Sequence, residues 1–203
     1  MGEVRAATED EAPALGAVLS RAFLDDPGFA WAAPHDGRRQ RLGPRYFELL
    51  MRHVYLPKGE THTTGDGRAV ALWAPPDRWK VPARRLLPLL PVMARACGAT
   101  LPRTMRMLGL MERLHEQHVE PHYYLAFVGT DPPAQGQGLG SALLAHVLHR
   151  CDVDGVPAYL EASSPANRSL YHRHGFEVVD ELRWPGGGPP FWPMWREPRE
   201  PGR

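Results

Sequence analysis

The stretch Gln135-Gly136-Gln137-Gly138-Leu139-Gly140-Ser141 follows an aromatic and apolar run, His122 to Val128, and precedes leucines at helical spacing. Glycines between a strand and a helix allow backbone N–H groups to converge on an anion, and the helix N-terminus adds the positive end of its dipole. The stretch therefore predicts a pyrophosphate site. A glycine-rich turn without a ligand is the alternative interpretation.

Two common phosphate-binding loops do not fit these residues. A P-loop requires the pattern GxxxxGK[ST], which the chain lacks. The dinucleotide-binding fingerprint requires glycine at position 141, where Ser141 stands. The glycines therefore indicate a pyrophosphate loop of another kind.

The hydrophobic pattern around the loop predicts a mixed α/β fold. Apolar and aromatic runs between turn signals predict about six or seven strands, and their order among the expected helices predicts a mixed central sheet with helices on both faces. At 203 residues the chain is long enough for one core and short for two, so we expect a single domain over 1–203. The expected strands are Val4 to Ala7, Glu60 to Thr64, Arg68 to Trp73, His122 to Val128, Ala158 to Ala162, Phe176 to Leu182 and Phe191 to Arg196.

Helices are expected after Thr8, over Arg38 to Val54, over an interrupted region from Trp79 to His118, after Gly138, and from Ser164 to Gly175. Within the interrupted region, Thr100 precedes Leu101-Pro102 and predicts a helix N-cap. Four side chains at helical spacing predict the buried stripe of the helix that follows: Met105, Leu108, Met111 and Leu114.

Composition gives few hints about partners. The formal net charge is +1, which gives no reason to expect nucleic acid or an anionic membrane. No run approaches the roughly 18 apolar residues of a membrane span, and the acidic N-terminus does not resemble a signal peptide. Cys97 and Cys151 are too few for a disulfide framework, so we expect a cytoplasmic protein.

A second motif lies downstream, in the run from Asn167 to Phe176. Asn167 and Tyr171 are four residues apart and share one face of a helix. With the glycine loop, this motif resembles the GCN5-related N-acetyltransferase (GNAT) superfamily. That family's pyrophosphate motif, Arg/Gln-x-x-Gly-x-Gly/Ala, matches Gln135, Gly138 and Gly140, and its Asn-x-x-x-Tyr-x-x-x-Gly-Phe block matches Asn167 to Phe176.

The resemblance implies acetyl-CoA as cosubstrate and an amine as acceptor, with direct transfer in a ternary complex and no metal. It implies a sheet splayed between its fourth and fifth strands, and Tyr171 as the general acid that protonates the CoA thiolate. The residues expected to bind acetyl-CoA are the backbone of Val128, Gly129 and Thr130, the loop from Gln135 through Gly136, Gln137, Gly138, Leu139 and Gly140 to Ser141, and Asn167.

A general base must also remove a proton from the amine, and Glu161 is the candidate. Strand alternation places Tyr159 and Glu161 on one face and Leu160 on the other. A carboxylate in a short apolar strand needs an explanation, because such groups are rarely buried without a partner. The alternatives are an ion pair with a nearby arginine, a bond to the backbone, or a water chain that acts as the base.

The acceptor side of the chain matches the family least. The core over about 122–179 carries the resemblance, whereas the helical segment over about 79–121 is variable. The run from Ala158 to Tyr171 also looks like puromycin N-acetyltransferases, which share the pattern LE-x-S-x-P-x-N-x-x-x-Tyr. This similarity suggests a small amine-bearing natural product or antibiotic as acceptor. An aromatic acceptor pocket would draw on Phe29, Trp31, Trp184, Phe191 and Trp192, and Asp25 and Asp26 would attract a cation.

Other interpretations stay open. A protein or peptide N-acetyltransferase would use the same fold with an open groove, and a catalytically idle module would bind acyl-CoA without transfer. Members of the family are often homodimers. His115-Glu116-Gln117-His118 is one residue short of the zincin pattern HExxH, so the sequence predicts no metal site.

Overall fold

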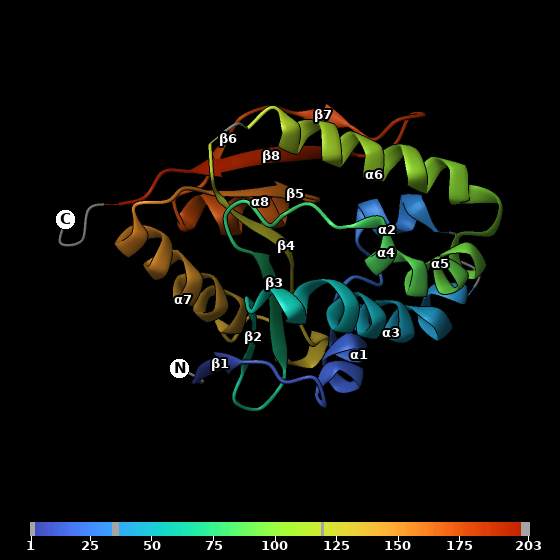
Figure 1. Cartoon of the computed structure of the whole chain (residues 1–203), viewed down its shortest axis with the longest axis horizontal. Coiled ribbons are helices and arrows are strands. Elements are labelled where there is room, and N and C mark those ends of the chain that lie inside the picture. Colours follow the sequence, from blue (N-terminus) through green and yellow to red (C-terminus); the bar gives the residue numbers. More distant parts are fainter. Residues whose placement is uncertain (1–2, 34–36, 119, 200–203) are drawn as a thin grey trace.

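An open eight-stranded sheet forms the centre of the chain (Figure 1). The structure is a computed structural model that describes residues 3–33, 37–118 and 120–199. The strand order is β1-β2-β3-β4-β5-β8-β6, and β7 also pairs with β8. The strands are β1 Val4–Ala6, β2 Thr61–Thr64, β3 Ala69–Ala74, β4 Tyr123–Thr130, β5 Ala158–Ala162, β6 Glu177–Val178, β7 Leu182–Arg183 and β8 Pro190–Arg196.

Helices cover both faces of this sheet, as the sequence predicts (Figure 1). On one face, α1 and α3 pack against Val70 and Leu72 of β3; on the other, α7 packs against Ala69 and Ala71. Helix α6 lies along β7 and β8 (Figure 1). The helices are α1 Ala12–Ala22, α2 Pro27–Ala32, α3 Arg38–Leu50, α4 Ala83–Leu86, α5 Leu90–Cys97, α6 Leu101–Glu116, α7 Leu139–Asp154 and α8 Pro165–Arg173.

The parallel contact between β4 and β5 is short. These strands pair only from Tyr123 opposite Ala158 to Leu125 opposite Leu160, whereas the other strand pairs are antiparallel. Beyond Leu125, β4 follows β3 alone, and a register shift leaves Ala126 without a partner on β3. The two strands therefore diverge, and one edge of β4 is open from Ala126 to Thr130.

Two details of the predicted element order are wrong. The expected strand from Phe176 to Leu182 is two short strands, β6 and β7, so the sheet has eight strands rather than six or seven. Helix α2 was not predicted, because the sequence Asp26-Pro27 is typical of the end of the preceding helix. The Asp26 carboxylate instead accepts a hydrogen bond from the Phe29 N–H at 3.0 Å and caps α2.

The buried face of α6 also differs from the prediction. Of the predicted stripe, Leu114 is buried and Met111 packs partly buried, but Met105 and Leu108 are 40% and 42% exposed, and Thr104, Met107 and His115 are buried instead. Both sets recur at helical spacing, so periodicity alone does not decide between them. The contact with α2 and with Trp184 selects the set that contains Met107.

Two predicted helix starts have different outcomes. Ser164 caps α8 through its hydroxyl, which accepts from the Asn167 N–H at 3.2 Å, as predicted. Thr100 occupies the N-cap position of α6, but its hydroxyl donates to the Ala32 carbonyl at 2.6 Å and makes no cap bond. Thr100 therefore joins α6 to α2.

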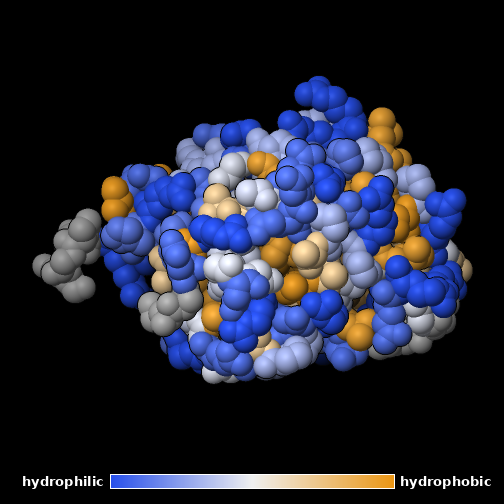
Figure 2. All heavy atoms as spheres, turned by 90° about the horizontal axis from the view of Figure 1, so that it is seen from below, coloured by the Kyte–Doolittle hydropathy of each residue, from blue (hydrophilic) through white to orange (hydrophobic). Residues whose placement is uncertain are grey.

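Hydrophilic residues cover most of the face seen in Figure 2, and hydrophobic residues gather in patches that include the side where α3 and α5 lie. Among the described residues, no helix is both long and apolar enough to cross a membrane.

Helix α1 approaches β4 closely at Gly129. A Cβ atom at this position would lie 2.9 Å from Ala22 Cβ and 3.0 Å from Leu19 Cδ2, both of which belong to α1. Distances this short force packed atoms to move. The absence of a side chain at Gly129 thus allows α1 to rest on the diverging end of β4.

Replacing Gly129 by alanine should lower the free energy of unfolding by about 1–3 kcal/mol, the usual cost of overpacking. Gly109→Ala is the matched control, because the nearest atom to its Cβ would be Arg113 Nη1 at 3.6 Å in the interior of α6. The control should raise stability by about 0.5–1 kcal/mol. Urea denaturation measures both, and equal stability of the two variants would contradict the close packing.

Candidate active site

The glycine loop forms an open turn at the N-terminus of α7. Gly136 and Gly138 have φ of +77° and +80°, in the left-handed region that favours glycine, and Gly138 is the N-cap residue of α7. A Cβ atom at either position would have no atom within 4 Å, so the space in front of the loop is free. The first N–H groups of α7 have no partner within their own helix, which suits an anion.

Side chains around this loop fix its position. Asp131, at the end of β4, forms two hydrogen bonds of 2.7 Å with Arg21 of α1. The Gln135 amide donates to the Thr130 carbonyl at 3.3 Å, and Arg68 donates to the Gln137 side chain at 3.3 Å. The loop is therefore held by α1, by β4 and by the turn between β2 and β3.

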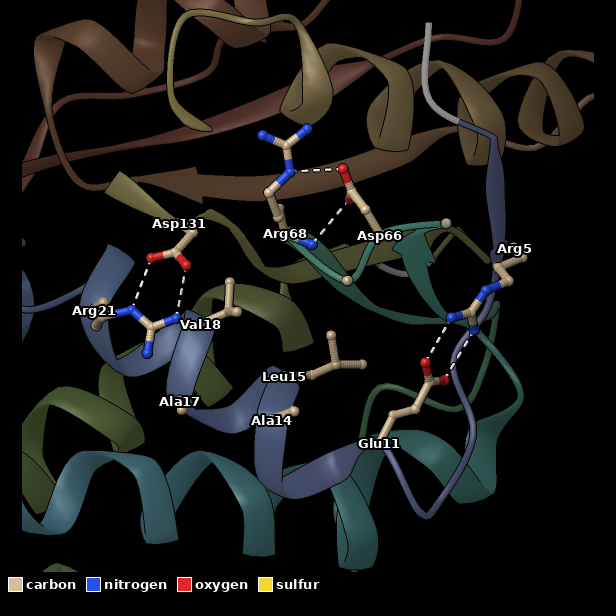
Figure 3. A pocket seen from close by; sticks show the side chains of 12 residues that line it. Arg5, Glu11, Ala14, Leu15, Ala17, Val18, Arg21, Asp66, Arg68 and Asp131 are labelled. Atoms are coloured by element: carbon tan, nitrogen blue, oxygen red, sulfur yellow. Dashed lines mark hydrogen bonds and ion pairs between the residues drawn. The ribbon is translucent and has the colours of Figure 1, made fainter. Parts of the chain in front are cut away.

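A cavity of about 550 Å³ lies beside α1, with Leu15 and Val18 on its floor (Figure 3). Its arginines are each paired with a carboxylate: Arg5 with Glu11, Arg21 with Asp131, and Arg68 with Asp66. Among the described residues, none that lines this cavity has a buried polar side-chain atom without a hydrogen-bond partner. The described residues that line this cavity therefore provide no unpaired buried polar group that could act on a substrate.

A second cavity, of about 440 Å³, lies where β4 and β5 diverge. Residues of α1, α2, α3, α5 and α6 line it together with β4 and β5, and most of the wall is apolar. Four of the residues predicted to catalyse the reaction or to bind acetyl-CoA line it: Val128, Glu161, Asn167 and Tyr171. The loop from Gln135 to Ser141 is not part of this wall and follows the open end of β4.

The open edge of β4 presents two of the three predicted N–H groups. The Asp131 N–H donates to the Arg68 carbonyl at 2.8 Å and thus points toward the β3 side. N–H directions alternate along a strand, so Gly129 also points toward β3, whereas Val128 and Thr130 point toward the gap. Val128 and Thr130 are the candidates for binding an oxyanion.

Glu161 is a buried carboxylate in the wall of the 440 Å³ cavity. Its side chain is 4% exposed, and one oxygen accepts a hydrogen bond of 3.0 Å from the Tyr124 hydroxyl. Its other oxygen has no hydrogen-bond partner among the described residues. Burial raises the pKa of Glu161 to about 7, against the opposing effects of the Tyr124 and Tyr159 hydroxyls, which favour the charged form. No arginine among the described residues forms an ion pair with it, so that alternative is not observed.

His115 is a site residue that sequence reasoning missed. Its Nδ1 lies 3.8 Å from the Glu161 carboxylate and 3.2 Å from the Met111 carbonyl, and its ring stacks on Trp79. A carbonyl only accepts, so Nδ1 carries the proton and Nε2 is an acceptor, which has no partner among the described residues. Burial lowers the pKa of His115 to about 3, which keeps the ring neutral.

Asn167 and Tyr171 reach the cavity from α8. The Asn167 amide donates to the Ser163 hydroxyl at 3.2 Å, and Ser163 in turn donates to Asp26. Asp26 is thus part of a structural network rather than an isolated surface acid. Tyr171 is buried, and burial raises the pKa of its hydroxyl, so Tyr171 holds its proton at neutral pH.

The predicted aromatic pocket is correct only in part. Phe29 and Trp184 line the cavity, but Trp31, Phe191 and Trp192 do not. Phe191 is fully buried and stacks on Trp184 at 3.9 Å, while Trp192 belongs to the core on the α7 side because neighbours in a strand alternate. The variable segment predicted over about 79–121 includes position 119, which lies outside the described residues.

No group of three His, Cys, Asp or Glu among the described residues is placed to hold a metal ion. His115 and His118 instead take part in a cluster of aromatic rings with Trp79 and Trp195. His115 is recognised as a site residue because the face of α6 on which it lies is turned to a buried carboxylate. Only the three-dimensional structure shows this arrangement.

Residues 101–176 match the family described as Acetyltransferase (GNAT) family. An uncharacterised N-acetyltransferase of Schizosaccharomyces pombe is 27% identical over 172 residues, which span 79% of this chain and 68% of the relative.

Solved structures of acetyltransferases are also similar to this chain. A Corynebacterium glutamicum protein, described as histone acetyltransferase HPA2 and related acetyltransferase, is 30% identical with a TM-score of 0.74 and full coverage of both chains. A Drosophila melanogaster polyamine N-acetyltransferase, which forms N-acetylagmatine, is 16% identical with a TM-score of 0.60, covering 96% of this chain and 99% of the other. The latter similarity concerns the fold alone.

Burial of Glu161 should make stability depend on pH. Because its folded-state pKa is raised, the folded protein keeps this proton over a range where the unfolded chain has released it, so the free energy of unfolding falls as pH rises from 4.5 to about 7. Glu161→Gln removes this loss. We expect the variant to be more stable at pH 8 by up to roughly 3 kcal/mol, with the gain shrinking toward pH 5.

Denaturation in urea at both pH values measures the effect. Glu177→Gln is the control, because the Glu177 side chain is 78% exposed and its replacement should change stability little at either pH. A gain for Glu161→Gln that is the same at pH 5 and pH 8 would contradict a buried carboxyl with a raised pKa.

Proposed function

The chain belongs to the acetyltransferase (GNAT) family, and on that basis we propose that it transfers an acetyl group from acetyl-CoA to the amine of a small molecule. The observation that carries the proposal is the buried carboxyl of Glu161, whose pKa is raised to about 7, in a cavity at the gap between β4 and β5. The Drosophila protein that shares the fold acts on a small amine, which is compatible with this acceptor class.

The residues at the open end of β4 fit acetyl-CoA. Its pyrophosphate needs converging N–H donors and free space, and the turn at Gly136 and Gly138 has both. Its pantetheine arm needs backbone partners along a strand, and the edge of β4 that faces the gap is open from Ala126 onward. When bound there, acetyl-CoA supplies an activated acetyl thioester. The Asn167 side chain would contact it from α8.

Acetyl transfer forms a bond from nitrogen to the acetyl carbon, breaks the carbon–sulfur bond, and moves one proton off the amine and one onto sulfur. Glu161 is suited to accept the first proton, because a base with a pKa near the working pH acts efficiently. Tyr171 is suited to donate the second, because burial keeps its hydroxyl protonated. The N–H groups of Val128 and Thr130 would stabilise the oxyanion.

A protein or peptide acceptor is the second candidate, favoured by the description of the Corynebacterium relative as a histone acetyltransferase. A peptide requires an open groove along the gap. Here α2, α5 and α6 contribute to the wall of the cavity, which favours a small acceptor. A catalytically idle module would bind CoA yet release no thiol.

The first test is a thermal-shift titration with acetyl-CoA, CoA and NAD, followed by thiol release with acetyl-CoA and a panel of amines and peptides. We expect stabilisation by acetyl-CoA and CoA but not by NAD, since a ligand of the folded state raises the melting temperature. Thiol release with peptides but not with free amines would favour the second candidate. No release with any acceptor would reject the proposal.

Gly138→Asp should abolish acetyl-CoA binding, because a carboxylate would occupy the space for the pyrophosphate and repel it. Gly155→Asp is a matched control at the other end of α7, since Gly155 also has a positive φ, +65°, and no atom within 4 Å of a Cβ. Calorimetry should show binding for the control only. Similar affinities for both variants would exclude the loop as the binding site.

Tyr171→Phe should lower turnover by about 10²-fold and leave the affinity for acetyl-CoA nearly unchanged, because only the proton donor is lost. Tyr123→Phe is the control: the Tyr123 hydroxyl donates to Asp154 at 3.2 Å, and the residue packs in the core beside α7. Steady-state kinetics on an identified acceptor distinguishes the two. Full activity of Tyr171→Phe would remove Tyr171 from the mechanism.

A further inference from the structure

The wall of the 440 Å³ cavity is unequally divided between polar and apolar parts. Its polar side includes Glu161 and His115, each of which has one buried hydrogen-bond acceptor without a partner among the described residues, and also Asp26, Arg39 and Glu112. The rest of the wall is mainly apolar, with aromatic rings from three elements and aliphatic side chains from the helices: Phe29, Phe47, Leu50, Met93, Met107 and Phe127.

Two buried acceptors indicate a ligand group rich in donors. A carboxylate oxygen and a neutral imidazole nitrogen both attract N–H groups, and leaving them unpaired is costly. A primary ammonium has three N–H donors and a positive charge, which suits a carboxylate. An alcohol has one donor and a carboxylate ligand has none.

The aromatic wall indicates what the amine is attached to. Phe29 and Phe47 stack at 5.5 Å, and Phe127 meets both rings at 6.0 and 5.5 Å, which makes one continuous apolar surface.

A second ammonium, as in a polyamine, would need another available carboxylate. Of the two other carboxylates that line the cavity, Asp26 already accepts from Ser163 and from the Phe29 N–H, and Glu112 stands at an exposed position of α6. Arg39 lines the same wall, and its positive charge would repel a second ammonium. An uncharged hydrophobic group fits this wall better.

The apolar wall continues to the protein surface. Leu86, Leu90, Met105 and Leu108 line the cavity and yet are 36–44% exposed; we call these four residues the mouth. They come from α4, α5 and α6, so the exposed apolar surface gathers at one opening. Exposed hydrophobic groups that are contiguous with a cavity are typical of ligand sites. The mouth thus extends the apolar site outward.

We propose that the acceptor is a primary amine on a bulky, uncharged hydrophobic group, with its nitrogen at Glu161 and its hydrophobic part reaching from the Phe127 wall to the mouth. This inference rests on the proposed function and specifies its substrate class. A small molecule is the occupant, because the mouth continues into an enclosed wall that ends at a buried carboxylate.

The test is thiol release with linear alkylamines from propylamine to octylamine, which have similar basicity, with agmatine and spermidine as polycationic rivals. We expect kcat/KM to rise by about threefold to fourfold per methylene, which corresponds to the free energy gained by burying one methylene group. For agmatine and spermidine, kcat/KM should be at least tenfold lower than for octylamine. A flat series, or a preference for agmatine or spermidine, would overturn the inference while the proposed function stands. No thiol release with any amine would reject both.

Variants at the mouth locate the hydrophobic part. Met105→Glu combined with Leu108→Glu should lower kcat/KM at least tenfold for octylamine and leave propylamine unchanged, because only the longer chain reaches the mouth. Leu87→Glu is the matched control: Leu87 is 60% exposed, lies next to Leu86, and does not line the cavity. Circular dichroism checks folding. An equal loss for both amines, or none for octylamine, would place the hydrophobic part elsewhere.

Discussion

The site depends on the early end of the pairing between β4 and β5. Only three residue pairs join these strands, from Tyr123 opposite Ala158 to Leu125 opposite Leu160. Had the ladder continued, the N–H groups of β4 would bind the backbone of β5 and no cavity would lie above the gap. Because it stops, unpaired N–H groups, a carboxylate on β5 and a helix N-terminus after β4 all border one space. The contact of α1 with Gly129 supports β4 on its other side.

Burial of polar groups at this site lowers the stability of the folded protein. Glu161 lies in an apolar wall with one hydrogen bond and no ion pair among the described residues, so its charged form is disfavoured. His115 is held neutral by the same surroundings. Such groups weaken a folded protein, and the cores on the two faces of the sheet offset the loss. The same burial brings the pKa of Glu161 close to neutral pH, where a carboxyl group both takes up and releases a proton readily.

Local sequence signals predicted part of this structure. Ser164-Pro165 indicated the start of α8, the apolar run gave the bounds of β5, and alternation gave the orientation of Glu161, since each depends on neighbouring residues only. The face of α6 was not predictable, because Met105 and Met107 are alike in hydrophobicity and tertiary contacts decide which is buried. His115 was missed for a related reason: 46 positions separate it from Glu161, and only the packing of α6 beside the sheet brings them together.

The register between β3 and β4 has a consequence for how such a protein can change over evolution. Ala74, the last residue of β3, is paired with Tyr124, near the start of β4, so the chain leaves the sheet and returns to it at adjacent points. Everything between, including α4, α5 and α6, is topologically one long excursion from a hairpin. Its length and composition could be exchanged at little entropic cost, without shifting the register of any strand. New acceptor specificities would thus arise by replacing this excursion while the strands, the glycine loop and α8 stay as they are.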